Sequence, residues 1–295
     1  MYPKNGISFA KIPFMKRFIG NINGKHGIFD FPHYDMYIGM ALREYGEFSE
    51  IEFSIMKKYI NPGDYVMDIG ANIGAFTVPF SKKVGSAGKV FAFEPQDLIF
   101  RILKKNIIKN SLKNVKSFNY ALGYKEACFH LKKIDYSKVG NFGGVSLKYD
   151  NSSFTREIKN KNYKVDIFKL DNFLNIKKCN FVKIDVEMME MEVLKGGENF
   201  INKFRPILWI ENHRKFPNHI NKFLLNNKYE PFWIDSLIFN NSNFFKNKKN
   251  YYKDIRTLNT LAIPKEKNQK NLQNYFDKIV DQNSKPIHTF VKVIN

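Results

Sequence analysis

The sequence has few cysteines and no hydrophobic run long enough to cross a membrane. Cys128 and Cys179 are the two cysteines among 295 residues, too few for a disulfide scaffold or a cysteine-based zinc site, and their isolation fits a reducing compartment. The N-terminal segment lacks the unbroken apolar stretch of a signal peptide, and no later run approaches the ~20 residues of a membrane span. We therefore expect a globular, cytoplasmic chain without a membrane span.

Acidic residues and arginines are also scarce. The chain has 48 Lys and Arg against 28 Asp and Glu, a net charge of +20, yet seven of those 48 basic residues are arginines. Arginine is the usual reader of bases and the bidentate partner of phosphate. The lysine excess is spread along the chain and accompanies abundant asparagine, as an A/T-rich coding bias would produce. The charge therefore indicates coding bias more than base readout: it could attract an anionic acceptor, and a nucleic-acid partner is possible but not favoured.

What the chain does have is enough apolar residues for a core, arranged as alternating strands and helices. Hydrophobic residues make up 43% and aromatic residues 16% of the sequence, which excludes a disordered chain. An alternation of strands with helices predicts an α/β fold built on a parallel sheet with right-handed crossovers. The predicted strands are 65–69, 89–94, 115–121, 181–186, 206–211, 229–234 and 257–263, and the predicted helices are 49–60, 73–83, 97–110, 189–203 and 218–225.

Segments outside this alternation define the expected organisation of the chain. Residues 1–48 are predicted to form an N-terminal extension that packs on the core, followed by the α/β domain over 49–264. Within that domain the polar stretch 124–171 is interpreted as a hairpin or loop insertion. Residues 265–295 form a C-terminal tail with a predicted helix over 272–280.

The stretch after the first predicted strand carries the most chemical information. It reads D-x-G-x-N-x-G, with Asp68, Gly70, Asn72 and Gly74 at the spaced positions. Glycines there allow a tight turn that a ligand can approach closely, and the following helix offers free N–H groups. Twenty residues later the second strand ends in Glu94, where a carboxylate can accept both hydroxyls of a ribose. Together these residues predict a nucleoside-binding site at the carboxyl edge of the sheet.

The D-x-G-x-N-x-G motif favours S-adenosylmethionine over a dinucleotide. A dinucleotide site carries a third glycine close to the first two, whereas this turn has two glycines led by an acid. Asp68 can bind an ammonium group, which dinucleotides lack. S-adenosylmethionine carries a ribose, an adenine and an amino-acid end, and it therefore fits the pattern better.

Several ordered segments resemble those of the FkbM-type S-adenosylmethionine-dependent methyltransferases. The resemblance covers about residues 45–264. It implies a class I (Rossmann-like) methyltransferase sheet of seven mostly parallel strands with one antiparallel strand and helices on both faces. It also implies O-methylation of a hydroxyl on a sugar, glycan or other small molecule. The segments are PGDYVMDIGANIGAFT (62–77), GKVFAFEP (88–95), YALG (120–123), KLDNFL (169–174), FVKIDVEMMEMEVLKGG (181–197), RPILWIEN (205–212) and NTLAIP (259–264).

The resemblance assigns cofactor roles residue by residue and shows one departure. Glu94 is implied to hold the ribose, and Ala121 to lie near the adenine. The chain has Met188 where the family usually has a glycine, so a side chain there is expected to narrow or reshape the acceptor pocket. The residues implied at the amino-acid end are Asp68, Gly70, Asn72, Gly74 and Thr77, with Ala71 and Pro95 also counted as cofactor-binding.

Methylation of a hydroxyl requires alignment of the acceptor and removal of its proton, which favours a carboxylate or histidine near the methyl group. Asp185 and Glu187 follow the fourth strand and are predicted to bind and orient the acceptor. His213 is the alternative base, or else a histidine of a surface loop. No metal is assigned, although these carboxylates with Glu211 and Asn212 offer oxygen ligands that suit Mg²⁺.

Two further functions stay open on the sequence. An RNA ribose methyltransferase would also attack with a hydroxyl and would benefit from the positive charge, whereas a non-catalytic nucleoside-binding module would not need the acids at 185–190. Two signatures of base methylation are missing, namely an Asn/Asp-Pro-Pro-aromatic segment and a Pro-Cys nucleophile. The sequence does not define an oligomeric state.

Overall fold

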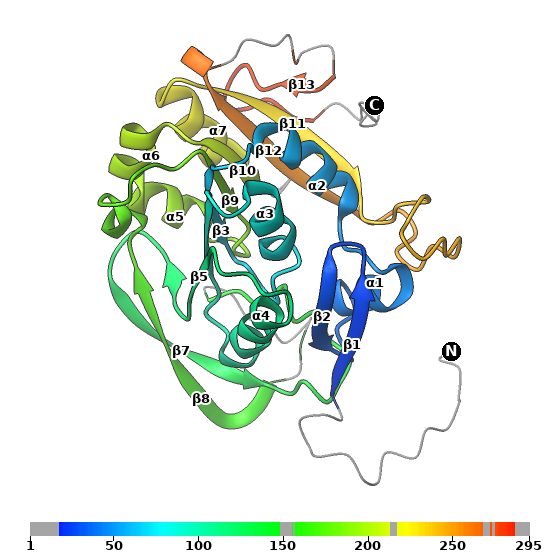
Figure 1. Cartoon of the computed structure of the whole chain (residues 1–295). Helices are drawn as coiled ribbons and strands as arrows, with labels where there is room; N and C mark the ends of the chain where they lie inside the picture. The colour runs from blue at the N-terminus through cyan, green and yellow to red at the C-terminus, as the bar shows by residue number, and fades with distance from the viewer. Residues whose placement is uncertain are drawn as a thin grey trace, which may run out of the picture.

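The computed structural model describes residues 18–147, 155, 157–212, 217–267, 272 and 275–286 (Figure 1). Within these residues the main sheet has eight strands in the order β13-β11-β12-β10-β9-β3-β4-β5. Five neighbouring strands are parallel: β3 (Tyr65–Ile69), β4 (Lys89–Phe93), β5 (Val115–Phe118), β9 (Phe181–Ile184) and β10 (Ile207–Glu211).

The other three strands extend the sheet by antiparallel pairing. They are β11 (Tyr229–Leu237), β12 (Arg256–Pro264) and β13 (Asp277–Lys278). β12 pairs antiparallel with both β10 and β11, and β13 pairs antiparallel with β11. The sheet of the described residues is therefore a mixed sheet in which β12 and β13 run against the rest. The sequence predicted seven strands with one of them antiparallel, and the structure adds an eighth strand, β13, which is also antiparallel.

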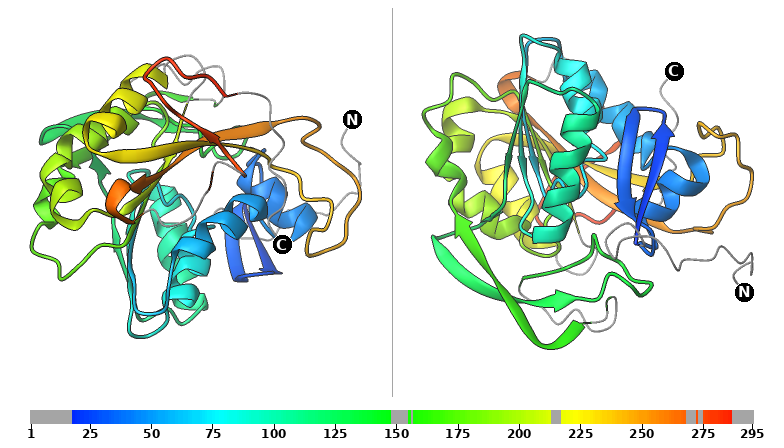
Figure 2. Two further views of the ribbon diagram at one scale, coloured as in Figure 1. Left: turned by 90° about the horizontal axis from the view of Figure 1, so that it is seen from above. Right: turned by 60° about the horizontal axis from the view of Figure 1, so that its bottom comes forward.

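Helices cover both faces of the sheet (Figure 2). Met67 and Val66 are neighbours on β3 and point to opposite faces, because successive side chains of a strand alternate. Met67 packs with Leu194, and Val66 with Phe80. The helices on the face of Val66 are α2 (Glu50–Met56), α3 (Thr77–Val84) and α4 (Asp97–Lys109), and those on the face of Met67 are α5 (Glu190–Gly196), α6 (Glu198–Phe204) and α7 (Pro217–Asn226).

The segment before the sheet forms a hairpin of β1 (Ile19–Gly24) and β2 (Gly27–Pro32), followed by α1 (Ile38–Tyr45). Its apolar side chains pack against α3 and α4. The buried amide of Asn106 on α4 accepts a hydrogen bond from the N–H of Asp30, and its Nδ2 donates to the carbonyls of Asp30 and Ile73. One side chain thus ties the hairpin to the turn that follows β3.

The polar stretch interpreted as a hairpin or loop contains a long hairpin of β7 (Ala127–Ile134) and β8 (Glu157–Phe168). β8 also pairs with β6 (Ala121–Leu122), so the described residues there form a three-stranded sheet. The predicted strand 115–121 is wrong at its end, because β5 stops at Phe118 and β6 joins this second sheet.

Three predicted helices differ from the structure. The predicted helix 73–83 begins only at Thr77, because residues 70–76 form the turn of the glycine motif. The predicted helix 189–203 is two helices, α5 and α6, because Gly197 between them has a φ of −122° and a ψ of 19°, which are not helical angles. The predicted helix 272–280 is wrong where it is described, because Asp277 and Lys278 pair with the open edge of β11.

Three short 3₁₀ turns complete the described elements: η2 (Lys57–Tyr59), η3 (Leu170–Phe173) and η4 (Lys265–Lys267). No helix in the described ranges has the length and apolar character needed to cross a membrane.

Candidate active site

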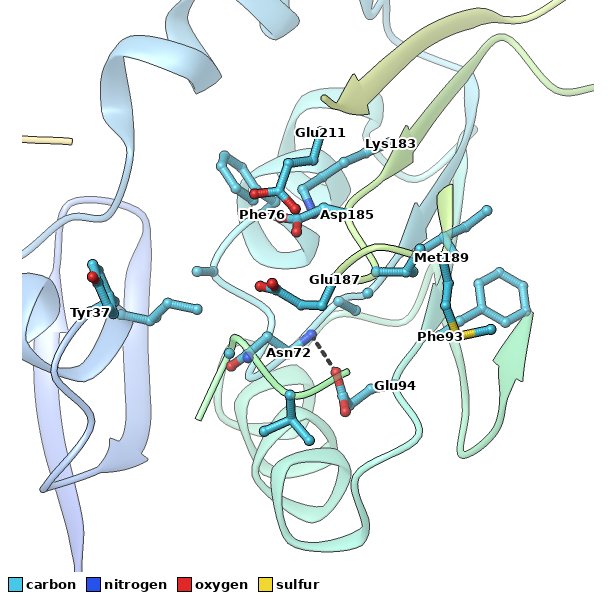
Figure 3. Close-up of a pocket in the computed structure, with 18 of the residues that line it drawn as sticks. Tyr37, Asn72, Phe76, Phe93, Glu94, Lys183, Asp185, Glu187, Met189 and Glu211 are labelled. Carbon is cyan, nitrogen blue, oxygen red and sulfur yellow. Dashed lines mark hydrogen bonds and ion pairs between the residues drawn. The ribbon is translucent and has the colours of Figure 1, made fainter. Parts of the chain in front are cut away.

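A cavity of about 450 Å³ opens at the carboxyl ends of β3, β4, β9 and β10 (Figure 3). Residues from other parts of the chain close it. They include Tyr37 before α1, Gly143 and Val145 of the insertion, and Thr257 on β12. In open α/β sheets ligands bind at this edge, so the cavity lies where the glycine motif predicts it.

The turn after β3 has a backbone that requires glycine at one position. Gly70 has a φ of 81°, and a Cβ there would lie 1.8 Å from the carbonyl oxygen of Asp185. Asn72 also has a positive φ, 50°, which asparagine tolerates better than most residues. Its N–H donates to the Oε2 atom of Glu94 over 3.0 Å. The turn and the end of β4 are thereby fixed to each other.

Glu94 is the buried acid of this half of the cavity. It is 3% exposed, and its Oε1 atom accepts a second hydrogen bond from the N–H of Gln96 over 2.8 Å. Burial raises the pKa of Glu94 to about 7, although the two backbone N–H groups act in the opposite direction. Ala71, Pro95 and Ala121 line the cavity as well, with apolar neighbours that include Leu122, Val145, Leu147 and Met189.

Asp68, Gly74 and Thr77 lie outside the cavity lining. Asp68 is fully buried, accepts a hydrogen bond from the hydroxyl of Thr77 over 2.6 Å, and faces the ammonium of Lys183 at 3.7 Å. A Cβ at Gly74 would lie 2.8 Å from Leu103, so this glycine allows α4 to pack closely. In this structure Asp68, Gly74 and Thr77 lie behind the residues that line the cavity. Their direct contact with a cofactor stays a prediction.

Lys183 is a cavity residue that the sequence analysis missed. It lies on β9, is 2% exposed, and places its ammonium 3.0 Å from Asp185 and 5.2 Å from the ring centre of Phe76. Burial lowers the pKa of Lys183, but the carboxylates of Asp185 and Asp68 outweigh burial and raise it. A lysine inside the otherwise apolar strand FVKI was the available signal, because a fully buried lysine is rare unless it is paired.

Three carboxylates gather on the other side of the cavity. The oxygens of Asp185, Glu187 and Glu211 lie within 4.8 Å of one another. In Figure 3 Asp185 and Glu211 meet beside Lys183, while Glu187 lies between this pair and Asn72. Burial, then the neighbouring charges of Asp185 and Glu190, raise the pKa of Glu187 to about 8. Burial and the same crowding raise the pKa of Glu211 well above its ordinary value.

The loop that carries Glu187 is strained. Glu187 and Met188 have φ values of 53° and 76°, in the left-handed region that side chains disfavour. The Oε1 atom of Glu190 accepts hydrogen bonds from the N–H groups of Val186 and Met188 and holds this geometry. The positive φ at residue 188 explains why the family usually has a glycine at the position that Met188 occupies here. Met189 lines the cavity and Met188 does not, so any effect of Met188 on the acceptor pocket would act through the backbone of this loop and stays a prediction.

Two further predicted residues follow β10. Asn212 lines the cavity, and its Nδ2 donates to Thr260 over 2.8 Å. His213 lies outside the described residues, so its role as a base stays a prediction. The carboxylate spacing also fits a divalent cation, and that alternative stays open.

This fold and this cavity are those of an S-adenosylmethionine-dependent methyltransferase. Residues 68–231 match the Methyltransferase FkbM domain, and the chain belongs to that family. The resemblance noted in the sequence is thereby confirmed, and with it the cofactor, S-adenosylmethionine.

Individual relatives are distant. Methyltransferase 1 of Beauveria bassiana is 26% identical over 181 residues, which cover 55% of this chain and 72% of the relative. Methyltransferase sdnD of Sordaria araneosa is 26% identical over 166 residues, covering 45% and 60%. The solved structure of Methyltransferase FkbM from Methylobacillus flagellatus is 14% identical with a TM-score of 0.46, covering 72% of this chain and 50% of that one.

Proposed function

We propose that the protein transfers a methyl group to a hydroxyl oxygen of a sugar, glycan or other small-molecule acceptor. The observation that supports this proposal is the cluster of Asp185, Glu187 and Glu211 beside a nucleoside site in one cavity. An unactivated hydroxyl must lose its proton as it attacks, and a carboxylate of raised pKa can accept that proton near neutral pH.

The residues on the β3–β4 side fit the cofactor. Glu94 presents a buried carboxylate to the cavity, which suits two ribose hydroxyls. Ala121, Leu122 and Met189 offer apolar surface for an adenine. When bound, S-adenosylmethionine supplies an electrophilic methyl group on a sulfonium.

The residues on the β9–β10 side are assigned to the acceptor. Among the hydrogen bonds of the described residues, none is donated to the Glu187 carboxylate. Glu187 is therefore assigned as the group that accepts the hydroxyl proton. Lys183 fixes Asp185 through its 3.0 Å contact, and Asp185 then orients the hydroxyl. Alignment of this kind is the main contribution an enzyme makes to a displacement at sulfonium.

A first experiment separates binding from acceptor identity. Calorimetry with S-adenosylmethionine should show micromolar binding, and the same preparation should methylate one class among nucleotide sugars, glycans and total RNA. Binding without transfer to any class would favour the non-catalytic module. Transfer to RNA, with affinity that falls steeply between low and physiological salt, would favour ribose methylation instead.

A further inference from the structure

A surface beside the cavity exposes aromatic rings together with lysines. It comprises residues 239–255 of the connection between β11 and β12, called here the aromatic–lysine loop. Phe244 is 48% exposed, and Phe245 and Tyr251 are each 39% exposed. Figures 1 and 2 show this connection projecting beyond α1. Its exposed lysines are Lys246, Lys248, Lys249 and Lys253.

The loop holds these rings in place through a fixed backbone. The hydroxyl of Tyr45 on α1 donates to the carbonyl of Lys249 over 3.0 Å and accepts from the N–H of Tyr251 over 2.9 Å. The buried carboxylate of Glu47 accepts from the N–H of Phe244 over 3.0 Å. Tyr252, 1% exposed, stacks on Tyr37. An ordered loop that keeps large apolar rings in water indicates a binding surface.

The charge of the loop is one-sided. Four lysines stand against one acid, Asp254. In the described part of the chain none of these lysines has an ion pair, whereas the neighbouring Glu47 is turned inward toward Lys25 at 3.4 Å. The surface therefore complements an anionic partner.

We propose that the aromatic–lysine loop docks the protein on an anionic lipid surface. Phe244 and Phe245, with ring centres 5.5 Å apart, enter the boundary between headgroups and acyl chains, and the lysines bind lipid phosphates. Stacked nucleic-acid bases fit less well, because the ammonium of Lys249 already lies 4.5 Å from the ring centre of Tyr251 and the loop contains no arginine.

The position of the loop gives docking a consequence for the active site. Ile255 ends the loop and Arg256 begins β12, and both line the catalytic cavity. Docking would bring the cavity close to the headgroup layer, where an acceptor carried on an anionic lipid could reach it. The docking proposal itself does not depend on the chemistry proposed for the cavity.

Vesicle sedimentation with the full chain tests the proposal. Vesicles of phosphatidylglycerol and phosphatidylcholine should sediment the protein, and pure phosphatidylcholine should not. The variant K246Q/K248Q/K249Q should bind roughly 100-fold more weakly, given the attraction of each lysine to an anionic surface, and F244S/F245S at least roughly tenfold more weakly. The matched control K133Q/K159Q/K161Q removes the same charge from exposed lysines of the β7–β8 hairpin and should bind as the parent does.

Melting temperatures of the two triple-lysine variants should agree with the parent within about 2 °C, because the changed side chains are exposed. F244S/F245S should melt lower, since both rings also pack against Gly46, and its binding is therefore measured well below its melting temperature. The proposal is overturned if the two triple-lysine variants lose equal affinity, since charge alone would then explain binding. It is also overturned if no vesicle binding occurs. Fluorescence anisotropy with a single-stranded RNA gives the third outcome: tight RNA binding that K246Q/K248Q/K249Q abolishes, without vesicle binding, would assign the loop to RNA.

Discussion

The acids on the two sides of the cavity have different surroundings: Glu94 is buried, whereas Asp185, Glu187 and Glu211 are partly exposed to the cavity. Glu94, on the β3–β4 side, accepts two backbone N–H groups. Asp185, Glu187 and Glu211, on the β9–β10 side, lie mainly against one another, with Lys183 as the cation beside them. Backbone donors fix the position of a carboxylate, whereas crowding raises its affinity for a proton. We therefore expect the β3–β4 side to fix the position of a ligand and the β9–β10 side to accept a proton.

The largest expected effect comes from the crowded side. Glu187→Gln should lower turnover by roughly 10²–10⁴-fold, the range for loss of a general base, and leave the affinity for S-adenosylmethionine within about threefold. Turnover of the parent should rise with pH through about 8, because the ionised carboxylate accepts the proton. Glu198→Gln, an exposed acid on α6, is the control and should change neither quantity.

Two results would contradict the assignment of proton transfer to the β9–β10 side of the cavity. Full activity of Glu187→Gln would show that another group takes the proton. Loss of activity in EDTA with recovery in Mg²⁺ would show that the three acids serve as cation ligands.

The next effect belongs to the backbone-bound acid. Glu94→Gln keeps the size of the side chain but weakens its acceptors for ribose hydroxyls, so calorimetry should show roughly 10–100-fold weaker binding of S-adenosylmethionine. Asp97→Asn, three residues away and exposed at the start of α4, should bind normally. Equal affinities for Glu94→Gln and the parent would place the ribose elsewhere.

A smaller effect concerns stability against pH. The pKa of Glu187 is raised to about 8 and that of Glu190 to about 7 by burial, so the folded state holds these protons more tightly than the unfolded chain. Stability from them is fully present below about pH 4.5 and is lost as the pH rises toward 8. Scanning calorimetry should show the parent losing a few degrees between pH 6 and 8 relative to Glu187→Gln. Parallel curves would contradict the raised pKa.

The smallest effect tests the strained loop. Met188→Gly removes the penalty of a side chain at a φ of 76° and should raise the free energy of unfolding by about 1 kcal/mol. Met191→Gly, inside α5, should lower it by more than about 1 kcal/mol, because glycine is unfavourable within a helix and the partly buried Met191 side chain packs against the core. Denaturant titrations measure both, and destabilisation by Met188→Gly would mean that its side-chain packing outweighs the strain.

The sequence predicts the fold best where a local pattern and the tertiary structure agree. β3 was predicted to the residue and α4 to within one residue, since an apolar run and an amphipathic stripe define them. It fails where a distant element decides the outcome. Residues 277 and 278 pair with the edge of β11, and the role of Met188 depends on backbone angles that no pattern of residue types reveals. Lys183 lies two residues before Asp185 on one side of the strand, but its second partner, Asp68, reaches it only through the pairing of β3 with β9.

The amide of Asn106 joins the β1–β2 hairpin at Asp30 to the glycine turn at Ile73. A transient opening of the hairpin would remove two of the three partners of that buried amide, the N–H and the carbonyl of Asp30, and weaken the hold of Asn106 on Ile73. The hairpin and the turn should therefore open as a single cooperative unit, and their backbone amides should exchange with solvent deuterium at a common rate. Ligand binding at the turn would then slow exchange more than forty residues away along the chain.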